Sequence, residues 1–152
     1  MMSLQLRAIT ADNWRAVAAL QVAEKQDHFI ESNSFSMAES LFEGKGISVG
    51  LYDGEVLVGY AMYGWYLASE GSIWLDRFMI DQGYQGRGYA KRFIRELLDH
   101  MQAEYVVQKI NLSLHPDNER AMKLYESFGF RLTGAIDDNG PVVGVVMECK
   151  VK

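Results

Sequence analysis

Residues 73–92 read IWLDRFMIDQGYQGRGYAKR, and this stretch decides the fold. Its first part, Ile73–Asp81, is mostly apolar and predicts a buried β-strand. Over Gly88–Met101 the apolar residues recur three and four positions apart, which predicts an amphipathic helix. A strand that leads through a short loop into a helix is typical of a parallel crossover connection.

The residues before this stretch predict a strand, two helices and a hairpin. Leu4–Ile9 alternates between apolar and polar residues and predicts a strand. A helix over residues 14–20 follows, with Thr10 or Asp12 as its N-cap. Residues 24–44 begin polar and irregular, and they predict a loop followed by a second short helix.

Three consecutive strands joined by tight turns are predicted next. Asp53-Gly54 is a strong hairpin dipeptide, and it separates Ile47–Tyr52 from Val56–Tyr66. A second turn at residues 69–71 leads into the strand that ends at Asp81. The three strands therefore form an antiparallel meander.

The C-terminal part predicts three more strands and one helix. Lys109–His115 predicts a strand, and Asn118–Phe128 predicts a helix that ends at Gly129. Strands over 130–136 and 142–151 form a final hairpin. The fold class is therefore α/β (α+β), with a mixed, mostly antiparallel sheet of six to seven strands and helices on both faces.

Size and composition limit the protein further. The 152 residues are 49% hydrophobic, which predicts one domain over residues 1–152 with a full core and excludes disorder. The single cysteine, Cys149, excludes an internal disulfide and a cysteine-based zinc site. The sequence has no apolar run long enough for a signal peptide or a membrane-spanning helix. A cytoplasmic location without a membrane partner is therefore expected.

The net charge of −5 argues against a nucleic-acid partner, because nucleic-acid binders usually carry a basic face. An acidic surface favours a small cationic partner. Solubility alone would explain the same charge.

The loop after Asp81 has the features of a phosphate-binding site. Gly86 and Gly88 leave the backbone N–H groups accessible, and the helix that follows offers free amides and a partial positive charge. Arg87, Lys91 and Arg92 add cationic side chains that suit a pyrophosphate. The alternative is a tight turn beside a solvated basic helix face.

Two common phosphate motifs do not match this loop. Gly83 and Gly88 have the spacing of a P-loop, but Tyr89 and Ala90 stand where Lys and Ser/Thr are required. The dinucleotide fingerprint also fails, since Lys91 occupies the position of its third glycine. The sequence has no Gly-x-Ser-x-Gly elbow of a serine hydrolase.

The loop resembles a motif of the GNAT acetyltransferases. Gln85–Ala90 (QGRGYA) matches their Gln/Arg-x-x-Gly-x-Gly/Ala pattern, and Trp74–Ile80 is similar to their central strand. Asn118–Phe130 resembles the second hallmark of the family. Within the family, Phe29–Ser32 and Tyr52–Gly64 look most like bacterial spermine/spermidine (diamine) N-acetyltransferases.

The resemblance implies that acetyl-CoA binds and donates its acetyl group to an amine. It implies a GNAT fold, in which the two parallel strands splay apart and free their backbone groups for the pantetheine arm. It leaves room for a homodimer. The implied cofactor-binding residues are Phe78, Met79, Ile80, Gln85, Gly86, Arg87, Gly88, Tyr89, Ala90, Lys91, Asn118, Ala121 and Tyr125.

Transfer to an amine requires proton movement, because an alkylammonium has a pKa of about 10.4. Tyr125 shares a helix face with Ala121 and Phe128, a position typical of a core tyrosine. The resemblance implies instead that Tyr125 is the acid that protonates the departing thiolate. A backbone N–H near Met79 is expected to hold the oxyanion.

Asp76 interrupts an apolar strand, where a carboxylate is costly unless it is paired. It is the candidate general base. Alternatives are the anchor of a water relay, an anchor for the substrate cation only, or a structural ion pair. Strand alternation places Arg77 on the opposite face, which makes it a poor partner for Asp76.

The acceptor is expected to be a polyamine. It is expected to take the acetyl group directly from acetyl-CoA in a ternary complex, without a metal. Glu24, Asp27 and Glu31, together with Asp76, are the candidate ligands of its ammonium groups, although each could be a solvated acid. Aromatic residues could pack along its chain or belong to the core: Trp65, Tyr66 and Trp74. Other open functions are acetylation of an aminoglycoside, an amino acid or a protein N-terminus, and a non-catalytic acyl-CoA sensor.

Overall fold

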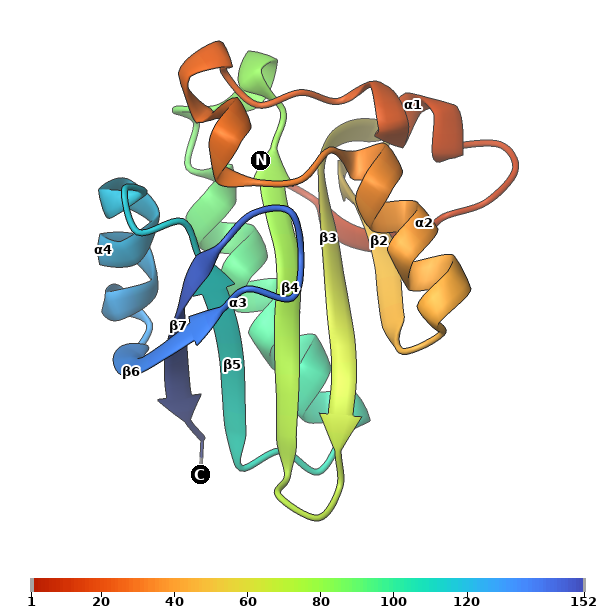
Figure 1. The fold of residues 1–152 in the computed structure, drawn as a ribbon. Coiled ribbons are helices and arrows are strands. Elements are labelled where there is room, and N and C mark those ends of the chain that lie inside the picture. The colour runs from red at the N-terminus through yellow and green to blue at the C-terminus, as the bar shows by residue number, and fades with distance from the viewer. Residues whose placement is uncertain (1, 152) are drawn as a thin grey trace.

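The computed structural model describes residues 2–151, and its elements follow the predicted order (Figure 1). Two short 3₁₀ helices, η1 and η2, are additions that the sequence pattern did not indicate. The elements are β1 (Leu4–Ala8), α1 (Trp14–Ala19), η1 (Glu24–Phe29), α2 (Asn33–Glu43), β2 (Gly46–Asp53), β3 (Val56–Leu67), β4 (Ser72–Ile80), η2 (Gln82–Tyr84), α3 (Tyr89–Glu104), β5 (Lys109–Leu114), α4 (Glu119–Ser127), β6 (Arg131–Asp137) and β7 (Gly144–Lys150).

The strands form one seven-stranded sheet in the order β1-β2-β3-β4-β5-β7-β6. All neighbours are antiparallel except β4 and β5, which are joined through α3 and pair in parallel. This confirms the predicted fold class of a mixed, mostly antiparallel sheet with one parallel pair.

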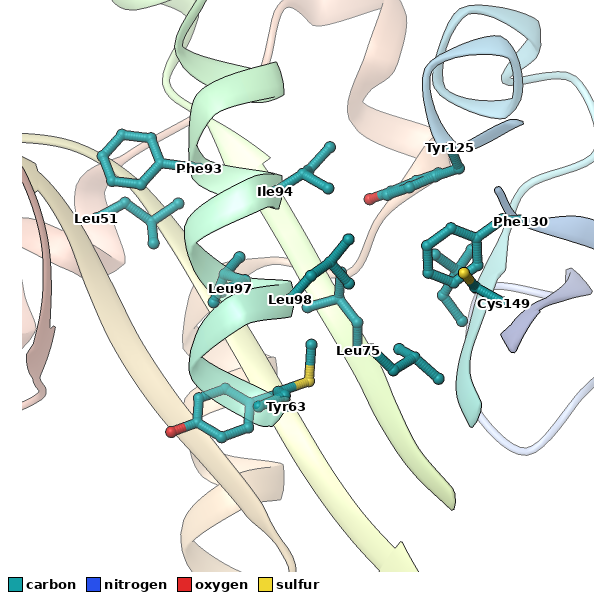
Figure 2. Packing of buried hydrophobic residues seen from close by; sticks show 14 of the residues in the cluster. Leu51, Tyr63, Leu75, Phe93, Ile94, Leu97, Leu98, Tyr125, Phe130 and Cys149 are labelled. Carbon is teal, nitrogen blue, oxygen red and sulfur yellow. The ribbon is translucent and has the colours of Figure 1, made fainter. Parts of the chain in front are cut away.

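Helices cover both faces of the sheet, as predicted. On one face α3 buries its apolar stripe, and Phe93, Ile94 and Leu97 are fully inaccessible to solvent (Figure 2). Tyr125 of α4 belongs to the same buried cluster. On the other face α1 contributes Val17 to a separate cluster, together with the sheet residues Tyr60, Met62 and Met79.

The parallel strands splay apart after four residue pairs. Their pairing ends at Leu75 and Leu112, although β4 continues to Ile80 and β5 to Leu114 (Figure 1). The β4 backbone from Arg77 to Ile80 therefore pairs with β3 on one side and has no strand on the other. The splay implied by the family resemblance is confirmed.

A β-bulge lies in β4 at the start of the splay. Met62 of β3 pairs with Arg77, whereas the next residue, Tyr63, pairs with Leu75. Asp76 is therefore an extra residue on the β4 side of the ladder. Bulges of this kind re-aim side chains and occur frequently beside active sites.

The bulge makes the expected alternation of side chains wrong at this point. Leu75 and Phe78 both pack in the cluster on the α3 face, although they are three positions apart. Arg77 bonds to α2 on the other face, where Met79 is also buried. Because the extra residue offsets the alternation, Arg77 and the Asp76 carboxyl lie on the same side of the strand rather than on opposite sides.

The start of α1 also differs from the expectation. The N-cap is Asn13, not Thr10 or Asp12. Its side-chain oxygen accepts a hydrogen bond from the N–H of Thr10 at 2.7 Å, and the N–H of Trp14 bonds to the carbonyl of Thr10 at 3.0 Å. A closed turn therefore precedes the helix and delays its start.

Candidate active site

A cleft of about 1500 Å³ lies at the splay of β4 and β5. Its lining comes from both sides of the sheet, with Ala121 and Tyr125 of α4 on one side and Glu39 and Glu43 of α2 on the other. The gap between the strands thus joins two spaces that an intact sheet would keep apart.

The loop between β4 and α3 forms an anion-binding end of this cleft. Gly86 and Gly88 have positive φ angles of 79° and 84°, and a Cβ atom added to either would meet no atom within 4 Å. Gly88 is the N-cap of α3, where no side chain caps the first amides. The loop therefore has free backbone donors and room beside them, which fits a pyrophosphate.

Two residues expected to bind the cofactor, Gln85 and Tyr89, use their side chains for hydrogen bonds within the protein. Gln85 donates to Gln26 of η1 at 3.0 Å and to the carbonyl of Ile80 at 2.9 Å, so it ties the loop to η1. The Tyr89 hydroxyl donates to Asp53 at 2.5 Å. Gln85 and Tyr89 can therefore serve a ligand through their backbones, while their side chains stabilise the loop.

The cationic residues of this region divide into two groups. Lys91 and Arg120 line the cleft. The guanidinium of Arg87 lies instead over the ring of Tyr84, 5.3 Å from its centre. Sequence reasoning missed Arg120, which is on α4 and far from the glycine-rich loop in the chain.

The residues expected along the pantetheine arm all line the cleft. Phe78, Met79 and Ile80 belong to the part of β4 with an open backbone edge. Asn118 caps α4 by accepting from the N–H of Ala121 at 3.3 Å. The open edge and the small side chain of Ala121 leave space for an extended arm beside β4.

Tyr125 is almost completely buried, with 8% of its surface exposed. Its ring packs against Phe130 with 5.7 Å between the ring centres. Figure 2 shows the ring reaching from α4 toward α3, with the hydroxyl at its leading end. Burial raises the pKa of Tyr125 well above its ordinary value, so the hydroxyl keeps its proton at neutral pH.

Asp76 lies at the bulge with its Oδ2 atom buried and without a hydrogen-bond partner among residues 2–151. Loss of solvent raises the pKa of Asp76 to about 8, while the nearby charge of Arg77 lowers it in part. Glu39 and Asp137 raise it further. A carboxyl group with this pKa can both give and take a proton near neutral pH.

Three elements meet at Arg77. Its Nη2 atom donates to Glu31 and to Glu39, each at 3.0 Å, and Nη1 donates to the carbonyl of Asp76 at 2.9 Å. Glu31, a candidate substrate ligand, is therefore in an ion pair with Arg77. A Cβ atom added to Gly140 would lie 3.0 Å from the Oε2 atom of Glu31, so the β6–β7 loop lies against this pair.

The other predicted acids lie elsewhere. Glu24 and Asp27 of η1 line a separate cavity of about 540 Å³, which Glu31 also borders. The acids that share the cleft with Asp76 include three that sequence reasoning missed: Glu39, Glu43 and Asp137. The four-residue spacing of Glu39 and Glu43 could have indicated that both lie on the same face of α2. No sequence pattern indicates that Asp137 lies in the cleft.

Two of the three candidate aromatic residues line the cleft, namely Trp65 and Trp74. Trp65 has a φ angle of 52°, an uncommon conformation for a residue with a large side chain. The third, Tyr66, donates its hydroxyl to the carbonyl of Val106 at 2.7 Å and packs against Tyr105.

The open strand edge, the anion-binding loop and the two ionisable groups at the gap together match a CoA-dependent acyltransferase. The pattern of the acetyltransferase (GNAT) family matches residues 10–130. The chain is 38% identical over 149 residues to a spermine/spermidine N(1)-acetyltransferase of Bacillus subtilis. The aligned residues cover 95% of this chain and 98% of the relative.

Two solved structures share the fold. A spermidine N-acetyltransferase from Vibrio cholerae, in complex with CoA and spermine, superposes with a TM-score of 0.76 at 22% identity over 97% of this chain and 95% of that chain. AAC(6′)-Ib, in complex with paromomycin and acetyl-CoA, gives 0.78 at 17% identity over 97% and 93%.

The chain belongs to the GNAT acetyltransferase family and is an N-acetyltransferase. The donor used by this family is acetyl-CoA. No helix within residues 2–151 is long and apolar enough to cross a membrane. The same residues contain no group of three or more His, Cys, Asp or Glu side chains placed to hold a metal ion.

Gly88→Ala is expected to raise the KM for acetyl-CoA by about tenfold, because a methyl group would enter the space beside the free amides of α3. The positive φ of Gly88 adds a strain of about 1 kcal/mol in the folded protein. Gly54→Ala is the matched control: Gly54 has a φ of 60° and similar free space, but lies in the β2–β3 turn. Steady-state kinetics and thermal unfolding of both variants check this. A KM for acetyl-CoA that is the same in Gly88→Ala as in Gly54→Ala would contradict the assignment of the loop as the phosphate-binding site.

Proposed function

We propose that this enzyme transfers the acetyl group of acetyl-CoA to a primary amine of a polyamine such as spermine or spermidine. The observation that carries the proposal is an acidic, tryptophan-walled space that opens onto the splay of the sheet. Ammonium groups pair with carboxylates, and Trp65 and Trp74 offer faces for a cationic or aliphatic chain. The likeness to a spermine/spermidine N(1)-acetyltransferase supports the same substrate class.

The cleft separates charge in a way that suits two substrates of opposite sign. On the side of α3 and α4 its lining includes Lys91 and Arg120, which suit the phosphates of CoA. Around Arg77 the lining is rich in carboxyl groups, which suit a polycation. These acids are Glu31, Glu39, Glu43, Asp76 and Asp137.

Acetyl-CoA supplies a thioester whose carbonyl carbon accepts the amine and whose sulfur leaves as a thiolate. In this chain the ionised carboxyl of Asp76 takes a proton from the acceptor nitrogen, directly or through a water molecule. Its pKa of about 8 makes it a much stronger base than an ordinary aspartate. The open β4 backbone near Met79 provides an N–H for the carbonyl oxygen as charge develops there.

Tyr125 completes the proton transfer from the other face of the sheet. Its pKa is raised, so it remains neutral and can donate its hydroxyl proton toward the leaving sulfur. Asp76 lies on the α2 face and Tyr125 in the cluster on the α3 face. The base and the acid thus lie on opposite sides of the gap through which the acetyl group must pass.

Release of CoA thiol from acetyl-CoA, followed with a panel of amines, tests the proposal. Spermine and spermidine are expected to give a kcat/KM at least about tenfold above that of short diamines, aminoglycosides and peptides, because only they span the acidic region with several charges. A preference for peptides or aminoglycosides would contradict the polyamine assignment. Binding of CoA without turnover of any amine would favour a non-catalytic sensor.

A further inference from the structure

The ion pairs of Arg77 occupy part of the space assigned to the acceptor. A single nitrogen, Nη2, donates to both Glu31 and Glu39 at 3.0 Å, and the three side chains are only 13%, 10% and 19% exposed. This is the arrangement that a substrate ammonium would adopt with the same carboxylates. The guanidinium of Arg77 thus occupies the position that an ammonium group of the substrate would otherwise take between Glu31 and Glu39.

The surroundings of this pair contain more acids than Arg77 can balance. Asp76 and Asp137 affect the same cluster, and burial together with neighbouring acids raises the pKa of Glu39. Asp137 accepts a hydrogen bond from Ser113 at 2.9 Å. Lys25 is a further cation in the lining of the cleft, and the ammonium of Lys45 lies over the ring of Trp65, 5.4 Å from its centre. The remaining negative charge is therefore left for the substrate.

We propose that Arg77 is a specificity-determining residue, which holds Glu31 and Glu39 as a resident cation and thereby limits how many substrate ammonium groups the cleft accepts. This inference rests on the proposed polyamine acetylation.

One hydrogen bond to the backbone and the bulge in β4 position the side chain of Arg77. Nη1 donates to the carbonyl of Asp76 at 2.9 Å, and the bulge directs the side chain to the face of α2. Removing one partner of a buried ion pair leaves the others uncompensated, which is strongly destabilising. Without Arg77, the two glutamates would therefore gain most from an additional ammonium group. A four-charge amine can supply that group more readily than a two-charge amine.

Kinetics of Arg77→Gln test the selectivity. The ratio of kcat/KM for spermine to kcat/KM for 1,5-diaminopentane is expected to rise about tenfold over the wild-type ratio. Arg77→Lys keeps the charge and is expected to keep the wild-type ratio. Arg7→Gln is the matched control, because Arg7 pairs with the exposed Glu55 outside the cleft. An unchanged ratio in Arg77→Gln would overturn the inference.

Thermal unfolding with added spermine gives a readout that does not depend on turnover. Spermine is expected to raise the Tm of Arg77→Gln by more than that of the wild type, since it replaces the missing cation. If the variant is unfolded when purified alone, refolding with spermine is expected to restore it. Equal Tm shifts, or failure to fold even with spermine, would overturn the inference. If the wild type acetylates no polyamine, the proposed function fails, and the Tm shifts still report on Arg77.

Discussion

Asp76→Asn is expected to lower kcat/KM for a polyamine by about 10²- to 10³-fold, the usual contribution of a positioned general base. The carboxyl lies at the gap in the sheet with a buried, unpartnered oxygen, so it has a free site for the incoming proton. Asparagine has nearly the same shape but cannot accept that proton. Initial rates with spermine under saturating acetyl-CoA measure the loss.

The pH dependence should identify the role of Asp76. Because the pKa of the free enzyme's Asp76 is about 8, wild-type kcat/KM is expected to rise as pH increases through 8, and Asp76→Asn should lose this inflection. An exposed aspartate on α3, Asp99, provides the matched Asp99→Asn control. A raised KM with an unchanged kcat would show that Asp76 only anchors the substrate cation.

Stability offers an independent check on the same variant. The folded-state pKa of Asp76 lies above its unfolded value of 3.8, so the folded state binds the proton more tightly. The stability that the folded protein gains by binding this proton is therefore full below about pH 4 and is lost as the pH rises toward 8. Asp76→Asn removes this loss and should unfold at a higher temperature than the wild type at pH 9.

Tyr125→Phe is expected to lower kcat by about 10²-fold while changing the KM for acetyl-CoA little. The hydroxyl has no hydrogen-bond partner among residues 2–151, and its removal leaves the packing against Phe130 intact. The Tm of the variant should therefore remain near that of the wild type. Single-turnover rates of thiol release would separate the chemical step from product release.

Tyr63→Phe is the matched control for this variant. Tyr63 is also buried, but its hydroxyl lies 2.9 Å from His100, away from the cleft. Its removal should cost about 1 kcal/mol of stability and leave kcat unchanged. The two tyrosines thus predict opposite patterns of activity and stability. An unchanged kcat in Tyr125→Phe would count decisively against its role as the acid.

The order of the elements was predictable because it depends on local patterns. Three- and four-residue spacing indicated α3, and Asp53-Gly54 marked the hairpin between β2 and β3. The splay was not visible in these patterns and came from the resemblance carried by Gln85–Ala90. Glycine spacing indicated the anion-binding loop, because the backbone geometry that it requires leaves a direct signature in the sequence.

The acidic side of the cleft was less predictable. Strict strand alternation put Arg77 on the wrong face, since an extra residue in a ladder depends on the partner strand and not on the sequence of β4. The ion pairs to Glu31 and Glu39 join residues 46 and 38 positions apart, and no local pattern encodes them. Asp137 reaches the cleft from the end of a hairpin strand for the same reason.

The bulge at Asp76 also has a consequence for how such a chain can diverge. A substitution in β4 changes one side chain, but losing a residue between Leu75 and Phe78 would remove Asp76 or Arg77 itself and let the ladder pair without the bulge. Only one of the two, the proton acceptor or the guanidinium beside it, would then remain at the gap. The length of β4 is therefore under constraint as strict as the identity of Asp76, and insertions or deletions there should be tolerated far less than exchanges.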